Sequence, residues 1–172
     1  HLWGVLIAFC SGAVLSGLII QDSTLRLGRR YGVVLALESL LLATAVPLLV
    51  HSQIWGMWLA AMACGLQNAM ATTFSGAAIR TSHLSGMFTD LGIGLGHLIR
   101  GMPLPMRRLT LSGLIISGFL AGGILGAWAF GVWRYHALLI PSALTGLTGV
   151  GYASYRHWIL LRQRRNDAPH AD

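Results

Sequence analysis

The stretch Leu2–Ile20, LWGVLIAFCSGAVLSGLII, runs from its first residue to its last without a charged side chain. About 20 apolar residues of helix are needed to cross the hydrocarbon core of a bilayer, so this stretch is long enough to span one. Similar runs cover 31–50, 55–79, 109–133 and 137–160. Over all 172 residues, 55% are hydrophobic and 10% are charged, and the mean hydropathy is +0.66. These values predict an all-α integral membrane protein, a helical bundle with about five transmembrane spans.

One further segment, 81–99 (TSHLSGMFTDLGIGLGHLI), is too polar to face lipid and too apolar for a solvated loop. All twelve basic residues of the chain are arginines, and their placement indicates what this segment does. If 81–99 crosses the membrane, five arginines lie on one side and seven on the other. If it enters and leaves on the same side, every arginine except Arg134 shares that side. The positive-inside rule therefore favours a re-entrant or broken helix, in a multi-pass protein of the cell inner membrane whose tail, 166–172, is cytoplasmic.

The net charge of +7 would suggest nucleic acid as a partner of a soluble protein, but here the arginines flank apolar runs. No soluble face is large enough to carry a basic stripe, so we expect the lipid bilayer as a partner and no nucleic acid. Cys10 and Cys64 lie inside apolar runs without ligand spacing and are expected to be packing residues. We expect neither a metal nor a cofactor, and homo-oligomer formation stays open.

The chain also contains a faint internal repeat. FCSGAVLSG (9–17) resembles FLAGGILGA (119–127), and RYGVVLALESLLLATA (30–45) resembles RYHALLIPSALTGLTG (134–149). With 81–99 re-entrant, the two hairpins have opposite orientations, which is the inverted repeat of many transporters. Chance alignment of apolar helices is the alternative. We expect one membrane domain over 1–165, with a first-repeat hairpin in 1–50 and a second repeat in 55–160.

Two motifs resemble a known family. GLQNA (65–69) and TSHLSGMFTDLGIGLGHL (81–98) are similar to the second-half signature of the YoaK family, bacterial membrane proteins of unknown function. Ser85-Gly86 stands where that family commonly has Thr-Gly, which keeps the hydroxyl group. The resemblance implies a membrane fold and location, and it brings no established activity. The family's first half carries related motifs that would precede His1, and the chain opens without Met, so we expect an N-terminally truncated fragment.

Gln67 and Asn68 place two amides in an apolar run, where unpaired donors and acceptors cost several kcal/mol. One interpretation is that Gly65 loosens the helix so that the amides contact a solute or the 81–99 segment. The other is that they hydrogen-bond neighbouring helices, at about 1 kcal/mol or less per bond.

In 81–99, His83, Asp90 and His97 recur every seven residues, which puts them on one stripe of a helix. Residues seven apart are about 10 Å apart along the axis, so these three cannot together ligate one metal ion. A carboxylate inside the membrane is costly and indicates a functional site. The candidate partners of Asp90 are His83, His97, Arg80 and Thr89. A structural polar cluster is the alternative. Glu38, within its span, raises the same question, although its match in the repeat is Ser142.

The glycines have a predicted packing role. Gly118, Gly122 and Gly126 recur every four residues and predict a smooth face for close helix contact. No glycine run has nucleotide-loop spacing, and no serine or cysteine stands with an obvious base, so we do not expect an enzyme.

Together these features predict an uncharacterised small-solute transporter or permease that is coupled to protons through Asp90. The residues expected to line the solute or proton path are Gln67, Asn68, His83, Ser85, Thr89, Asp90 and His97. A non-catalytic scaffold or sensor is the first alternative. A lipid-modifying intramembrane enzyme is the second, and it would require a water-accessible nucleophile.

Overall fold

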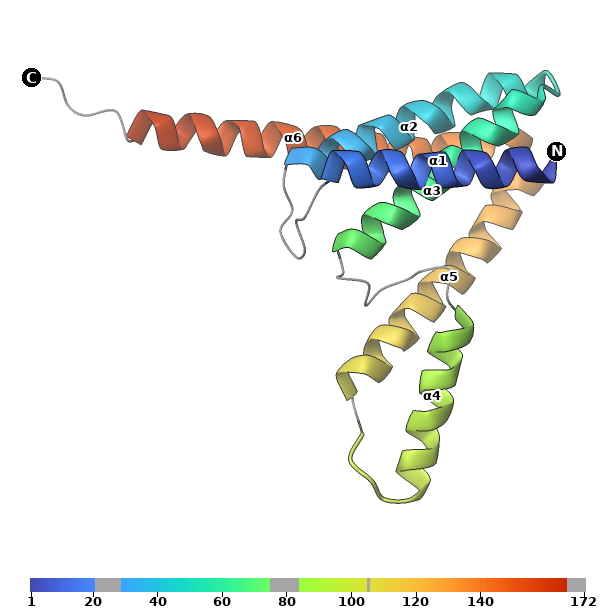
Figure 1. The fold of residues 1–172 in the computed structure, drawn as a ribbon, viewed down its shortest axis with the longest axis vertical. Helices are drawn as coiled ribbons and strands as arrows, with labels where there is room; N and C mark the ends of the chain where they lie inside the picture. The colour runs from blue at the N-terminus through green and yellow to red at the C-terminus, as the bar shows by residue number, and fades with distance from the viewer. Residues whose placement is uncertain (21–28, 75–83, 105, 167–172) are drawn as a thin grey trace, which may run out of the picture. The chain divides into compact units, whose positions relative to one another are not determined.

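The computed structural model describes residues 1–20, 29–74, 84–104 and 106–166, and within them it is entirely helical (Figure 1). The helices are α1 (Leu2–Ile20), α2 (Arg29–Val50), α3 (Ile54–Phe74), α4 (Leu84–Ile99), α5 (Met106–Trp133), a 3₁₀ turn η1 (Arg134–Leu138) and α6 (Leu139–Asn166). Within the described residues, each apolar run found in the sequence is helical, which confirms the all-α prediction. The contacts between residues divide the chain into two compact units, His1–Ile79 with Tyr135–Asp172, and Arg80–Arg134.

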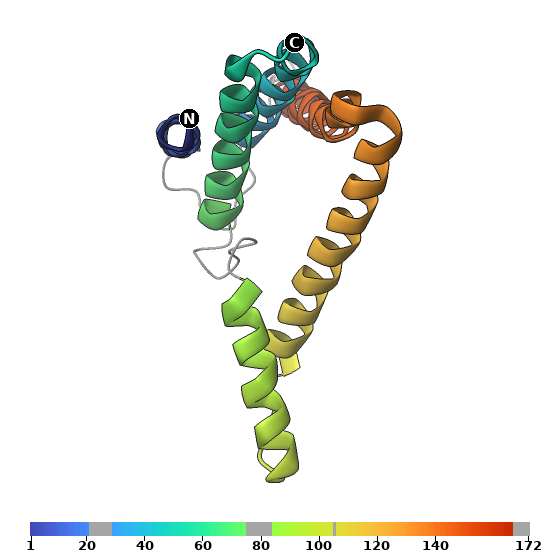
Figure 2. The same ribbon diagram turned by 90° about the vertical axis from the view of Figure 1, so that its right-hand side faces the viewer.

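The first unit is a layer of four helices. Figure 2, viewed nearly along α1, shows them in the order α1, α3, α2, α6. The contacts agree with this order, because α3 packs against both α1 and α2, and α6 packs against α2. The buried cluster consists of Ile20, Tyr31, Val34 and Leu66, contributed by α1, α2 and α3. The apolar core of this unit therefore lies where α1, α2 and α3 meet.

The directions of these helices follow from their contacts. Gly4 faces Trp58 and Gly12 faces Leu66, so α1 and α3 run parallel. Figure 1 shows α2 and α6 running in opposite directions. Their contacts agree, because Ser39 pairs with Ser142 while Gly149 lies against the earlier residue Gly32.

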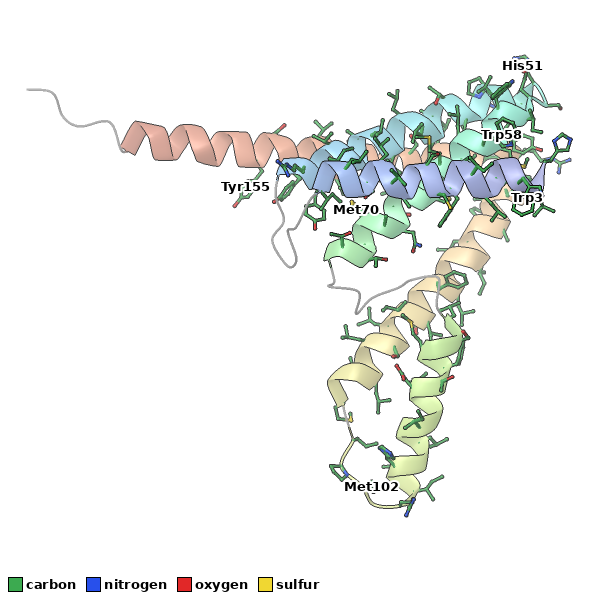
Figure 3. The ribbon with its side chains drawn as sticks, in the orientation of Figure 1. Trp3, His51, Trp58, Met70, Met102 and Tyr155 are labelled. Atoms are coloured by element: carbon green, nitrogen blue, oxygen red, sulfur yellow. The ribbon has the colours of Figure 1, made fainter. Side chains whose placement is uncertain are left out.

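Aromatic side chains mark both ends of the layer. Trp3, His51 and Trp58 lie at one end and Tyr155 at the other (Figure 3). Tyr31 and Tyr155 line a hollow of about 500 Å³ between α2 and α6. At the end marked by the tryptophans, a second hollow of about 690 Å³ has Gln53, Trp55 and Tyr135 in its wall. Aromatic residues at both ends are typical of helices that meet two membrane interfaces.

The second unit is the α4–α5 hairpin, whose helices pack against each other. The buried side of α4 carries Met87 and Gly94. On α5, Ser112 and Ile116 are buried. A Cβ added to Gly94 would come within 2.5 Å of Leu109 Cδ2, so this glycine allows a close approach of α5.

Helix α4 ends in a defined cap. Gly101 has φ +67°, its N–H donates to the Leu98 carbonyl (3.1 Å), and the Met102 N–H donates to the His97 carbonyl (2.9 Å). This is a Schellman motif, in which a left-handed residue, usually glycine, satisfies the last carbonyls of a helix. Pro103 follows, and because proline lacks an N–H it cannot donate a backbone hydrogen bond. The chain therefore stops α4 sharply at Ile99.

Among the described residues, three stretches of helix could cross a membrane by length and composition: Leu2–Ile20, Arg30–Val50 and Leu109–Tyr152, the last of which runs through α5 and α6. α3, which carries Gln67 and Asn68, is not among them. The molecule is a membrane-type helical protein, and the count of five spans stays a prediction.

Candidate functional site

The candidate site on α4 lies along the side of that helix that packs toward α5. Met87 and Gly94 are buried, and Asp90 and His97 are half-buried, with the spacings of three and four residues that give one helical face. Asp90 and His97 therefore share the stripe that their spacing predicted. His83, the third member of the stripe, lies outside the described residues.

The His97 side chain is half-buried. Its Nδ1 is buried without a hydrogen-bond partner. The buried neighbour on the same face, one turn earlier, is Gly94, which leaves room for Leu109. His97 therefore lies one turn from the glycine that allows the close contact between α4 and α5.

Ser85 and Thr89 lie on the exposed side of α4. The Thr89 hydroxyl donates to the Ser85 backbone carbonyl at 2.9 Å. A threonine in a helix commonly makes this bond to the preceding turn. The Thr89 hydroxyl therefore bonds within its own helix, and its interaction with Asp90 stays a prediction.

The amides Gln67 and Asn68 lie on α3. Gln67 is exposed and Asn68 is half-buried, and the Asn68 carbonyl accepts a bond from the Thr72 hydroxyl at 2.8 Å. α3 is continuous from Ile54 to Phe74, so the expectation that Gly65 loosens the helix is wrong. Gly65 instead lies directly against the Phe9 backbone carbonyl, where any side chain would collide.

The amides and the α4 stripe belong to different compact units. Each element is present as the sequence predicts, and a contact between them stays a prediction. Among the residues that the structure describes, no group of three or more His, Cys, Asp or Glu could hold a metal ion.

The three packing glycines of α5 have open surroundings. At Gly118, Gly122 and Gly126, an added Cβ would meet nothing within 4 Å. All three are exposed, in contrast to Ser112 and Ile116 on the same helix. Their role in close packing stays a prediction for a neighbour beyond the described part of the chain.

A polar contact between α2 and α6 was not predicted from the sequence. The Ser39 hydroxyl donates to the Ser142 carbonyl at 2.7 Å, and the Ser142 hydroxyl donates to the Ser39 carbonyl at 2.8 Å. Gly146 allows this approach, because a Cβ there would lie 2.6 Å from Ser39 Oγ. Small residues that bring two helix backbones together are typical of membrane interfaces. The signal present in the sequence is the pattern of small residues at 142, 146 and 149.

Fold and site together define a polytopic, all-helical membrane protein with polar side chains set into apolar helices. A family model described as a protein of unknown function (DUF1275) matches residues 1–151, and the chain belongs to this family. Comparison with curated proteins and with solved structures gives no match. The resemblance to the YoaK family found in the sequence is therefore confirmed at the level of the family.

Proposed function

We propose that this protein moves a small solute across the bacterial inner membrane, with α4 as a re-entrant polar element and Asp90 as its proton-carrying group. The observation that carries the proposal is that Asp90 and His97 share a partly buried face on a short, glycine-rich helix. Polar helices that do not cross the whole membrane are a recurrent feature of transporter binding sites. Ionisable side chains within a membrane are rare and mark solute, ion or proton paths.

The helix directions of the first unit support re-entry of α4. α3 is antiparallel to α2, because Gly56 lies against Ala45 and Leu49 across the turn that joins them. α6 is also antiparallel to α2, so α6 begins on the side where α3 begins. If α3 and α6 both cross the membrane, as the sequence predicts, the chain between the end of α3 and the start of α6 crosses it an odd number of times.

The helix lengths favour α5 for that crossing. α5 has 28 residues and leads directly through η1 into α6. α4 has 16 residues and is about 24 Å long, less than the roughly 30 Å of a hydrocarbon core. This supports the arrangement that the arginine distribution favours, with the C-terminus cytoplasmic.

Labelling of introduced cysteines, one per variant, in sealed vesicles tests the topology. Gln53→Cys and Met102→Cys put thiols at two exposed loop positions, and the wild type measures the background from Cys10 and Cys64. Re-entry of α4 predicts that a membrane-impermeant maleimide labels the two positions from opposite sides. Labelling of both from the same side would mean that α4 crosses the membrane.

Uptake by liposomes that contain the purified protein tests the function. Candidate solutes are screened with and without an imposed pH gradient, against empty liposomes. Asp90→Asn is expected to abolish the response of uptake to the gradient, and Asp172→Asn is the matched control for loss of one negative charge. An unchanged pH response in Asp90→Asn would contradict the proton role. Absence of uptake for every solute would contradict transport and favour a scaffold or sensor.

A further inference from the structure

Glu38 is a buried carboxyl group in the interior of α2. Its side chain is 3% exposed, and Oε2 has no hydrogen-bond partner. Four described side chains have a buried nitrogen or oxygen atom without a hydrogen-bond partner: those of Ser16, Glu38, Trp58 and His97. Glu38 is the carboxyl group among them. It lies within Arg30–Val50, one of the stretches able to span a membrane.

The neighbours of Glu38 place it where α2 meets the rest of its unit. α2 packs against α3 on one side and α6 on the other. Ser39 is directed toward α6 by its two bonds with Ser142, and the preceding residue of a helix is turned by about 100°. Cys64 of α3 interacts electrostatically with Glu38. The carboxyl group is therefore close to α3, beside the polar contact between α2 and α6.

No described cation can neutralise this carboxylate. The ionisable side chains described on the packed helices are Cys10 on α1, Cys64 on α3, and Tyr152 and Tyr155 on α6. None of these carries a positive charge. On α2 itself, Arg30 is eight residues away, or about 12 Å along the axis. An unpaired carboxylate in an apolar environment costs far more free energy than its protonated form.

We propose that Glu38 is an intramembrane proton-binding site, a carboxylic acid in the closed packing of α2 against α3 and α6. Loss of the proton leaves a charge that only water or a cation can stabilise, so ionisation requires this packing to open. Ser39 is the next residue after Glu38. Opening of the packing at Glu38 would therefore also act on the Ser39–Ser142 contact. The link from this proton to solute movement rests on the proposed function, whereas proton binding itself does not.

The first test labels the wild-type protein in liposomes with dicyclohexylcarbodiimide, an apolar reagent. Its carbon forms a bond to a carboxyl oxygen while the carboxyl proton moves to its nitrogen, so the protonated acid reacts. Mass spectrometry of the peptides locates the adduct over a series of pH values. We expect an adduct on Glu38 that decreases about tenfold per pH unit above its midpoint, as for one proton. A water-soluble carbodiimide is expected to leave Glu38 unlabelled. Absence of the adduct at every pH, or an adduct that does not change with pH, would overturn the proposal.

The second test uses infrared spectroscopy of the carbonyl stretch of protonated carboxyl groups. We expect Glu38→Gln to remove a band that wild type and Asp90→Asn both retain. If Glu38→Gln retains every protonated-carboxyl band of the wild type, the proposal is overturned. If Glu38 binds a proton and no solute is taken up, transport is contradicted and the proton site stands; if solute moves and Glu38 is never labelled, the proton site alone is overturned.

Discussion

Glycines at the helix contacts of the first unit differ from glycines along α5 of the second unit. In the first unit, Gly12 and Gly65 lie against the backbone of a facing helix, and Gly149 lies against the backbone of α2. In the second unit, Gly118 and Gly122 have nothing within 4 Å of the position where a Cβ would be. The same residue type therefore fixes the distance between helices at Gly12, Gly65 and Gly149 and has no neighbour within its own hairpin at Gly118 and Gly122. The comparison shows that spacing alone does not tell which glycines pack.

The largest effect is expected from Gly65→Val. The new side chain would collide with the Phe9 carbonyl, and because that atom belongs to the backbone, α1 must move away from α3. Overpacking of this kind costs about 1–3 kcal/mol. Gly118→Val is the matched control, because it makes the same change in helix propensity at a position where an added Cβ meets nothing within 4 Å. Thermal unfolding in detergent, followed by circular dichroism, measures both variants. Equal destabilisation of the two would break the distinction between the units.

A smaller effect is expected at the contact between α2 and α6. Ser39→Ala and Ser142→Ala each remove one of the two hydroxyl-to-carbonyl bonds. Hydrogen bonds between membrane helices are worth about 1 kcal/mol or less. A double-mutant cycle on unfolding free energy measures the coupling, with Thr44→Ala as the control, because its hydroxyl bonds only within its own helix, to the Leu40 and Leu41 carbonyls. Strictly additive costs would mean that the two serines do not act as a pair.

The smallest effect is expected from Gly118→Ala. With no neighbour to meet, the methyl group adds only helix propensity, which favours alanine over glycine by up to about 1 kcal/mol. Unfolding should therefore occur at the same temperature or slightly higher. A clear loss of stability would show that this face is covered in the assembled protein. Comparing the oligomeric state of the variant and the wild type would then tell whether a second copy covers it.

The positions of the helices followed from the sequence because uninterrupted apolar runs define them. The expected span 2–20 coincides with α1, and the segment singled out as polar contains α4. The stripe of Asp90 and His97 was also predictable, since it depends only on spacing within one helix. These are local properties of the chain.

The roles of individual polar and small residues were not predictable, because they depend on partners far away in sequence. Ser39 and Ser142 are separated by 103 residues, and nothing near either serine identifies the other. Gly65 looked like a point of helix weakness, and its contact with Phe9 of α1 makes it a point of close packing. The bond from the Thr89 hydroxyl to the Ser85 carbonyl of its own helix was not predicted either.

The order of helices in the first unit has a mechanical consequence. Among the described residues, α6 touches the rest of its layer along α2 alone. The attachment of α6 to the other helices of the layer therefore depends on its contact with α2. Ser39, Ser142 and Gly149 hold this contact close, so substitutions there would affect the attachment of α6 to the whole layer.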